Sequence, residues 1–316
     1  MKGLLAALIV ISILLTGTAA LTEGSGGGRG GRGGMGGINK SDDAELQTMI
    51  AETAPKFQLM AYEDAETGTS LQYQLFIPED YDDSVSYPLI QFIPDASVVG
   101  KGTDAVLTQG WGGLIWATDT EQEKRPAFVV VPIFTETVVD DNANHSEQIE
   151  VALCMLQSLT ETYSIDTNRI YTTGQSMGGM TSFYLNATYP EFFAASLFVG
   201  SQWDVSVLQG LEEKNFFYIV AAGDPKASAG QAELMALFDK DGAAYSHAEW
   251  SAQDDPETQN KAVANLLAEG NKGNFITFTL GSTTTGGSSG GGAGEHMTSF
   301  DYAYKIEAVR DWLFEQ

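Results

Sequence analysis

A serine flanked by glycines, between a predicted strand and a predicted helix, constrains this chain more than any other feature. The segment 170–179 reads IYTTGQSMGG and places Ser176 at the centre of G-x-S-x-G. A serine hydroxyl is a weak nucleophile unless its oxygen faces both a base and a substrate carbonyl, and a sharp strand-to-helix turn exposes it in this way. Such a turn crowds the backbone two residues to either side, where Gly174 and Gly178 relieve the crowding. The pattern predicts that Ser176 is a nucleophile.

The residues around the motif support this interpretation over a plain glycine-rich turn. The chain contains 35 glycines, so the motif alone could arise by chance. However, the preceding residues 169–173 are β-prone, and residues 177–189 contain no proline and carry apolar side chains at helical spacing. We therefore expect a strand, a turn and a helix, with the N–H of Met177 at the helix start as a donor to a developing oxyanion.

The N-terminus has the pattern of a secretory signal. A charged residue, Lys2, precedes an apolar run over residues 4–15 and small residues up to Ala20. The run is too short to span a bilayer comfortably, which favours cleavage after Ala20 over the alternative of a retained anchor. No cysteine comes directly after the run, as a lipoprotein would need, and Cys154 is the only cysteine in the chain. We predict an exported protein without an internal disulfide and without stable membrane insertion after cleavage.

Composition narrows the choice of partners. The formal net charge is −26, with the acidic residues scattered along the chain. This charge disfavours binding to nucleic acid or anionic lipid and is consistent with solubility. Residues 21–43 are glycine-rich and predict a flexible linker, which leaves residues 44–316 as one catalytic domain.

Beyond the linker, predicted strands alternate with predicted helices. The strands are expected at 56–62, 70–77, 88–93, 127–133, 169–173, 194–200, 216–222, 246–250 and 275–280. The helices are expected at 148–163, 177–189, 229–240 and 256–268, with a terminal helix through Tyr302 and Leu313. The alternation predicts an α/β fold, a mostly parallel central sheet with helices on both faces.

An activated serine needs a base, and the chain offers three histidines. His145 precedes the nucleophile, and His247 lies inside a predicted strand. His296 follows the last predicted strand in a glycine-rich segment, which is the place of the base in the order Ser, Asp, His. We predict His296 as the base, with a helix-capping role as its alternative.

Beside the serine and the base, the site needs an acid that orients the base. This acid should lie at the carboxyl end of a parallel strand, because those ends meet at one edge of the sheet. Asp224 follows the strand at 216–222 and is our candidate, with Asp204, Asp254 and Asp255 as rivals. The second oxyanion donor should follow the strand at 88–93. The N–H of Ala96 or of Ser97 is expected there, since Pro94 has no N–H.

With these segments in this order, the chain resembles the α/β-hydrolases. It is similar to secreted bacterial carboxylesterases related to polyhydroxybutyrate depolymerases and feruloyl esterases, often labelled prolyl-oligopeptidase-like. The resemblance runs from about Lys56 to the end and is most specific at 166–179, 189–195 and 294–296. It implies the roles of Ser176 as nucleophile, His296 as base and Asp224 as acid. Pro94-Asp95 stands where the family usually has His-Gly, and no large lid is evident.

Three tryptophans, Trp111, Trp116 and Trp203, follow strand ends and could stack on a substrate group or serve as packing residues. The sequence thus predicts a secreted serine esterase that acts on a small-molecule or polysaccharide-linked ester and needs no metal or cofactor. Two alternatives stay open: a prolyl-oligopeptidase-like serine peptidase, and a non-catalytic envelope binding protein on the same fold.

Overall fold

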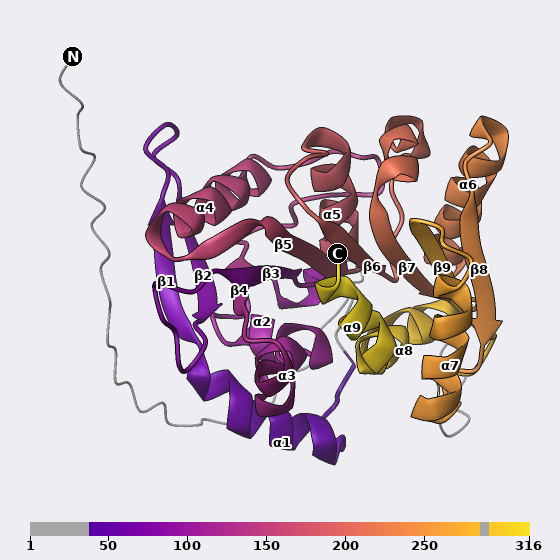
Figure 1. Cartoon of the computed structure of the whole chain (residues 1–316), viewed down its shortest axis with the longest axis horizontal. Coiled ribbons are helices and arrows are strands. Elements are labelled where there is room, and N and C mark those ends of the chain that lie inside the picture. The colour runs from indigo at the N-terminus through magenta and orange to yellow at the C-terminus, as the bar shows by residue number, and fades with distance from the viewer. Residues whose placement is uncertain (1–37, 285–290) are drawn as a thin grey trace, which may run out of the picture.

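A computed structural model describes residues 38–284 and 291–316 (Figure 1). The predicted signal peptide at 1–20 and the predicted linker as far as residue 37 lie outside the described residues. From Asp43 onward the chain folds around one sheet. Asp43 caps the first helix, where its side chain accepts a hydrogen bond from the Leu46 N–H at 3.0 Å.

The described residues form nine strands in the order β1-β2-β4-β3-β5-β6-β7-β9-β8. Their bounds are β1 Gln58–Glu63, β2 Ser70–Phe76, β3 Tyr87–Ile93, β4 Phe128–Ile133, β5 Ile165–Gln175, β6 Ala195–Val199, β7 Asn215–Ala221, β8 Tyr245–Trp250 and β9 Gly273–Phe278. Every pairing from β4 to β8 is parallel, and only β1 with β2 and β2 with β4 are antiparallel. The prediction of a mostly parallel sheet is confirmed.

Helices cover both faces of this sheet (Figure 1). They are α1 Ala44–Thr53, α2 Ala105–Thr108, α3 Asp119–Lys124, α4 Gln148–Thr162, α5 Met177–Thr188, α6 Pro225–Asp241, α7 Pro256–Leu267, α8 Gly291–Lys305 and α9 Glu307–Phe314. Helices α4, α5 and α6 lie on one side, and α7, α8 and α9 lie on the other with α2 and α3. None of the helices in the described part of the chain is long and apolar enough to cross a membrane.

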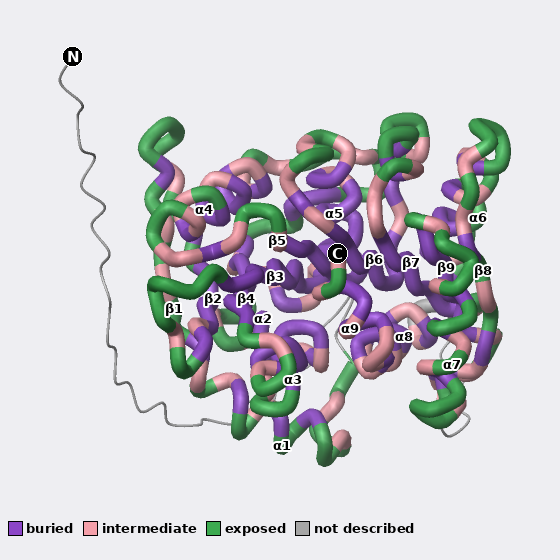
Figure 2. Tube along the Cα trace, viewed as in Figure 1, coloured by how far each residue is buried: buried purple, intermediate pink, exposed green. Residues whose placement is uncertain are grey.

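The two faces of the sheet build two separate hydrophobic cores, because successive side chains of a strand point to opposite faces. In β7, Tyr218 and Val220 pack in the core beneath α4, α5 and α6, whereas Phe217 and Ile219 pack in the core with α7, α8 and α9. The tube in Figure 2 shows the central strands buried and the outer loops exposed. The inner strands β3, β4, β6, β7 and β9 are buried along nearly their whole length because both of their faces are covered.

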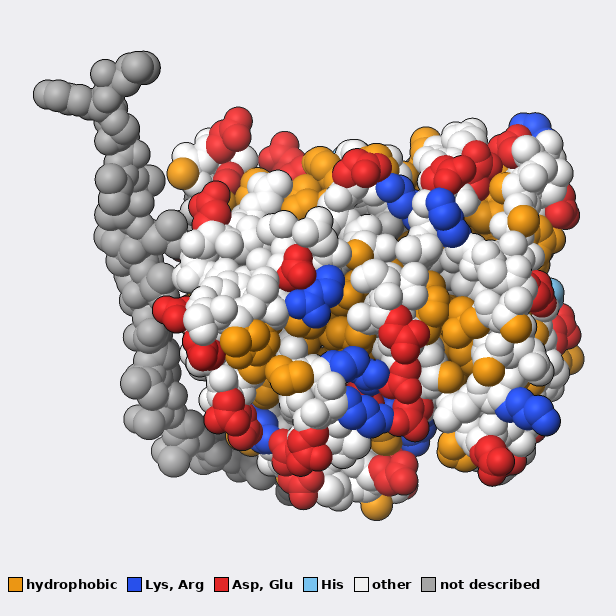
Figure 3. Space-filling model, in the orientation of Figure 1, with side chains coloured by type: hydrophobic (Ala, Val, Ile, Leu, Met, Phe, Trp, Pro, Cys, Tyr) orange, Lys and Arg blue, Asp and Glu red, His pale blue; other side chains and the backbone are white. Residues whose placement is uncertain are grey.

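Most charged side chains of the described residues lie outside these cores. Acidic side chains are spread over the visible face rather than gathered in one block (Figure 3). This distribution matches the scattered acidic residues of the sequence.

Several helices and strands begin or end at other residues than predicted, and one of these differences matters for function. Helix α6 begins at Pro225, because Asp224 caps it, and β9 ends at Phe278, because a turn at Gly281 with φ of 80° follows. The predicted terminal helix is two helices that break at Ile306, whose ψ of 100° is extended. The first of them, α8, begins early enough to include His296. We expected this histidine in a loop before the last helix.

Candidate active site

The turn between β5 and α5 holds Ser176 in a backbone conformation that few residues adopt. Its φ is 52° and its ψ is −119°, a region disfavoured for residues with a side chain. The N–H of Ser176 donates to the Val199 oxygen of β6 at 3.0 Å, which fixes the turn to the neighbouring strand. The predicted strand, turn and helix are confirmed.

The flanking glycines are there because the backbone passes too close for a side chain. A Cβ on Gly174 would lie 2.3 Å from the carbonyl carbon of Gly178. A Cβ on Gly178 would lie 1.9 Å from the carbonyl oxygen of Ile93, at the end of β3. The start of α5 is therefore pressed against the end of β3, where the second oxyanion donor was expected.

The second turn of α8 brings His296 to the serine. Its Nε2 lies 2.9 Å from the Ser176 Oγ, and its Nδ1 forms a short contact with Asp224 Oδ2. The carboxylate can only accept here, so Nδ1 carries the proton and Nε2 is free to accept the serine proton. The structure thus brings the three predicted residues together in the order a triad needs.

Asp224 performs two tasks with its two carboxylate oxygens. Oδ1 accepts hydrogen bonds from the N–H groups of Lys226 and Ala227, both at 3.2 Å, and so caps α6. Oδ2 faces the imidazole. The side chain is buried, and the helix N-terminus favours its negative charge. The cap fixes the carboxylate without engaging the oxygen that orients His296.

The rival residues are occupied elsewhere. His247 bonds to the Thr277 hydroxyl at 3.0 Å, and the ring of His145 lies 4.3 Å from that of Tyr184. Asp204 and Asp255 each cap a helix that is not next to His296. Among the described residues, no hydrogen bond joins His296 to any of these groups or to Asp254.

The loop after β3 presents one of its two candidate amides. Asp95 is buried, and its Oδ1 accepts the Ser97 N–H at 2.7 Å. That bond uses the Ser97 amide. No hydrogen bond from the Ala96 N–H or the Met177 N–H to another described residue is found, so these two amides are available as a pair of donors.

A buried network that sequence reasoning missed ties this loop to the serine turn. Gln175, which directly precedes Ser176, donates from Nε2 to Asp95 Oδ2 at 2.7 Å and to Gln109 Oε1 at 3.1 Å. Gln109 Oε1 in turn accepts the Asp95 N–H at 3.3 Å. The sequence signal for this network was Pro94-Asp95, which stands where His-Gly was expected. A carboxylate in a buried loop needs hydrogen-bond partners. Asp95 therefore fixes the loop that carries Ala96.

The three tryptophans considered as substrate contacts lie in different surroundings. Trp116 lies in the core, 1% exposed, and its indole N–H donates to the Gly112 oxygen at 2.9 Å, so the prediction that it contacts substrate is wrong. Trp111 packs beneath the Lys305 ammonium at 4.3 Å, which favours the packing alternative. Trp203 lines a pocket of about 370 Å³ together with Met180 of α5. None of the three triad residues lines this pocket, so a substrate contact of Trp203 stays a prediction.

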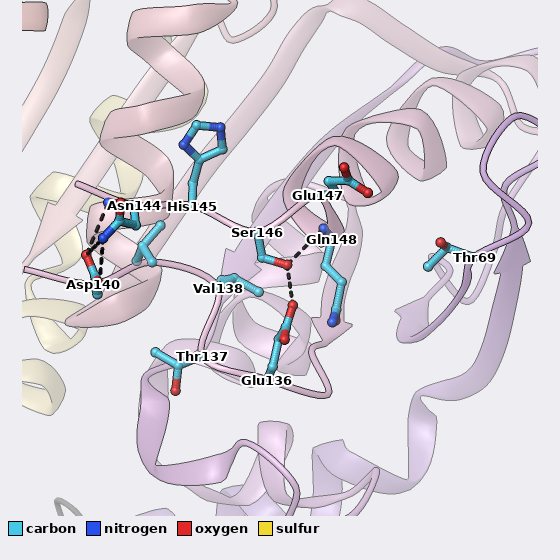
Figure 4. Close-up of a pocket in the computed structure, with 11 residues that line it drawn as sticks. Thr69, Glu136, Thr137, Val138, Asp140, Asn144, His145, Ser146, Glu147 and Gln148 are labelled. Carbon is cyan, nitrogen blue, oxygen red and sulfur yellow. Dashed lines mark hydrogen bonds between the residues drawn. The ribbon is translucent and has the colours of Figure 1, made fainter. Parts of the chain in front are cut away.

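A larger pocket, about 600 Å³, lies in the connection from β4 to α4 and contains none of the three triad residues. Figure 4 shows that the ring of His145 points away from the pair formed by Glu136 and Ser146, which hydrogen-bond each other. Within the described ranges, no group of three or more His, Cys, Asp or Glu side chains is arranged to hold a metal ion.

Comparison with known proteins gives likenesses in structure but not in sequence. No family model and no curated protein matches the chain. A thermostable esterase aligns with a TM-score of 0.67 at 23% identity, over 84% of this chain and 64% of that chain. A ferulic acid esterase aligns at a TM-score of 0.53 and 10% identity, over 82% of this chain and 98% of that chain.

A proposed dipeptidyl aminopeptidase IV from Bacteroides ovatus also aligns, with a TM-score of 0.53 at 14% identity, over 82% of this chain and 36% of that chain. This chain spans less than two thirds of the length of the thermostable esterase and about a third of the peptidase. At these identities the comparisons establish the fold. The chain has the α/β-hydrolase fold that its sequence predicted.

Proposed function

We propose that this protein is a serine hydrolase that cleaves carboxylic esters through an acyl-enzyme. The observation that carries the proposal is the chain of contacts from Ser176 Oγ to His296 Nε2, at 2.9 Å, and from His296 Nδ1 to Asp224 Oδ2. A serine activated in this way attacks acyl carbonyls. The esterases with a similar fold support the choice of an ester as substrate.

In the proposed reaction, Ser176 Oγ attacks the ester carbonyl carbon as His296 Nε2 takes its proton. The negative charge that develops on the carbonyl oxygen is held by the N–H groups of Met177 and Ala96. His296 then gives the proton to the departing alkoxide, and the alcohol leaves. The same imidazole then takes a proton from water, and the resulting hydroxide attacks the acyl carbon. As the bond from that carbon to Ser176 Oγ breaks, His296 returns the proton to Ser176 and the acid is released. Asp224 keeps the imidazole in the required tautomer and stabilises its charged form.

The substrate and the place of action belong to the same proposal. We favour short-chain, acetyl or feruloyl esters of a small molecule or of a polysaccharide, with Trp203 near the substrate. Export rests on the sequence pattern of residues 1–20 alone. A mass spectrum of the protein recovered from the culture medium of the producing cell tests both secretion and cleavage after Ala20.

Fluorophosphonate labelling followed by peptide mapping tests the chemistry. We expect one labelled serine, Ser176, and no label in Ser176→Ala or His296→Ala. His247→Ala is the matched control, since this histidine is held in β8, and it should label like the parent. Ser176→Ala should also lower turnover of a nitrophenyl ester by on the order of 10⁴-fold or more. A parent protein that takes no label would overturn the proposal and favour the binding protein.

A peptidase is the second candidate, favoured by the structural likeness to the proposed dipeptidyl aminopeptidase. The triad is shared by both activities, so the substrate decides. Rates on a nitrophenyl ester and on a nitroanilide with the same acyl group separate them. A kcat/KM that is higher for the anilide would replace the esterase by the peptidase.

A further inference from the structure

A buried glutamate directly precedes the triad histidine and has no role in the proposed chemistry. Glu295 lies in α8 next to His296 and is 9% exposed. Both of its carboxylate oxygens accept the N–H of Gly281, each at 3.1 Å. Gly281 belongs to the segment that follows β9, so this bond joins the end of β9 to the start of α8.

The same carboxylate lies against the loop that carries the triad acid. A Cβ on Gly223 would be 1.9 Å from Glu295 Oε1 and 2.1 Å from its Cδ. Gly223 immediately precedes Asp224 and follows β7. One side chain thus contacts the segments after β7 and after β9, while its own backbone continues into His296.

The hydrogen-bonding oxygens of this side chain make the contact specific. A carboxylate that is removed from water costs free energy unless its oxygens are hydrogen-bonded. Gly281 supplies that bond only when α8 and the segment after β9 are in contact. The other contacts of α8 lie farther along the helix, where Thr298 Oγ1 donates to Thr283 Oγ1 at 3.1 Å and the Tyr304 hydroxyl lies 3.1 Å from Thr173 Oγ1. Among these hydrogen-bonding side chains of α8, Glu295 is therefore the one nearest to His296 along the helix.

We propose that Glu295 is a positioning residue of the triad: it holds the second turn of α8 against the Gly223 loop and Gly281, and so keeps His296 between Asp224 and Ser176. This inference rests on the proposed function, since it assigns a role at the same site. A displacement of about 1 Å at a reacting group lowers a rate by roughly 10²-fold. Removing the carboxylate should therefore lower kcat while leaving the substrate contacts, and hence KM, in place.

Two substitutions at Glu295 distinguish the effect of its hydrogen bond to Gly281 from the effect of its side-chain volume. We expect Glu295→Ala to lower kcat for a nitrophenyl ester by about 10- to 100-fold, with KM within about threefold of the parent. Glu295→Gln keeps the volume and one oxygen that can accept the Gly281 N–H, so it should restore kcat to within about threefold. Glu307→Ala is the control, because this glutamate begins α9 and pairs with Lys124 on the surface.

Gly223 allows an independent test through the opposite partner. Gly223→Ala places a methyl group where the carboxylate lies, so it should displace Glu295 and lower kcat to a similar extent. In Gly223→Ala/Glu295→Ala the methyl group has room, so the double variant should be no slower than Glu295→Ala. Such non-additivity is expected only for residues that act through one contact. If Glu295→Ala fails to fold, Gly223→Ala and Glu295→Gln still decide the matter.

The outcomes that test the role of Glu295 differ from those that test the proposed esterase activity. Wild-type kcat in Glu295→Ala, equal losses in the Ala and Gln variants, or a raised KM with unchanged kcat would each overturn the inference. If the parent hydrolyses no ester, the proposed function fails, and the downfield proton resonance of His296 Nδ1–H decides instead. Its presence in the parent and Glu295→Gln and its loss in Glu295→Ala supports positioning, whereas its persistence in Glu295→Ala refutes it.

Discussion

The serine and the histidine of the candidate triad are held in place by different means. The serine turn is fixed by its own backbone: Gly174 and Gly178 allow the close approach, and Ser176 takes the left-handed φ. His296 lies on a helix whose position depends on side chains, Glu295 at its start and Tyr304 near its end. Consecutive residues therefore specify the first part of the site, and residues scattered along the chain specify the second. The two parts should respond differently to substitution.

The largest effect is expected where the helix-borne histidine meets its acid. In Asp224→Asn, Oδ1 can still cap α6, which turns the amide nitrogen toward His296 Nδ1. An N–H donor at that position forces the proton onto Nε2, so the imidazole can no longer accept the serine proton. We expect kcat/KM for a nitrophenyl ester to fall by on the order of 10⁴-fold with little loss of folding.

Asp255→Asn is the matched control for this change. Asp255 also caps a helix, α7, through a bond to the Thr258 N–H at 3.0 Å, and it was a rival for the role of acid. It should keep the activity of the parent. An Asp224→Asn variant with near-parental activity, or an inactive Asp255→Asn variant, would mean that the acid is misassigned.

A smaller but still large effect is expected in the serine turn. Gly178→Ala would bring a methyl carbon within 1.9 Å of the Ile93 carbonyl oxygen, and backbone cannot move aside as a side chain can. Either α5 or the end of β3 must shift, so the Met177 and Ala96 amides separate. We expect about a 10²-fold loss of kcat/KM and a loss of about 1–3 kcal/mol in the free energy of unfolding.

Gly210→Ala is the control for the serine turn. Gly210 lies in the short helix Gln209–Glu213, where a Cβ would meet no atom within 4 Å. Urea denaturation and ester turnover should both match the parent. If Gly178→Ala behaves the same way, the turn is not fixed by its backbone and the contrast with α8 is lost.

The same contrast explains what the sequence could predict. Ser176, Asp224 and His296 could be predicted to lie together because the motif and the order of the strands are readable from the sequence, and a parallel sheet brings the carboxyl ends of its strands to one edge. Trp116 was misplaced because an indole after a strand looks the same whether it faces substrate or core. The roles of Asp95 and Glu295 depend on partners 80 and 14 residues away along the chain, and no spacing rule relates those pairs.

Helix α8 shows most directly where prediction from the sequence fails. Its start was misjudged because residues 291–294 read GGAG, and glycine disfavours a helix interior. In the structure, tertiary contacts hold the helix: Asp301 accepts the Trp111 N–H at 3.0 Å and pairs with Lys40 at 2.6 Å. Propensity yields to such contacts when they are numerous, and they come from segments far apart in the sequence.

The smallest effect is expected from the loss of a single hydrogen bond near the end of α8. Burial raises the pKa of Tyr304 far above its usual value, so its hydroxyl stays neutral and bonds to Thr173 at neutral pH. Tyr304→Phe removes that bond, but Thr173 Oγ1 keeps its bond to the Leu197 oxygen at 2.9 Å. We expect the free energy of unfolding to fall by about 1 kcal/mol, measured by urea denaturation, and turnover to stay within about threefold. The contact of Glu295 with Gly281, which is nearer to His296, stays in place, so loss of the Tyr304 bond should leave His296 where it is. A drop in turnover of tenfold or more would show that the position of His296 depends on this distant bond as well.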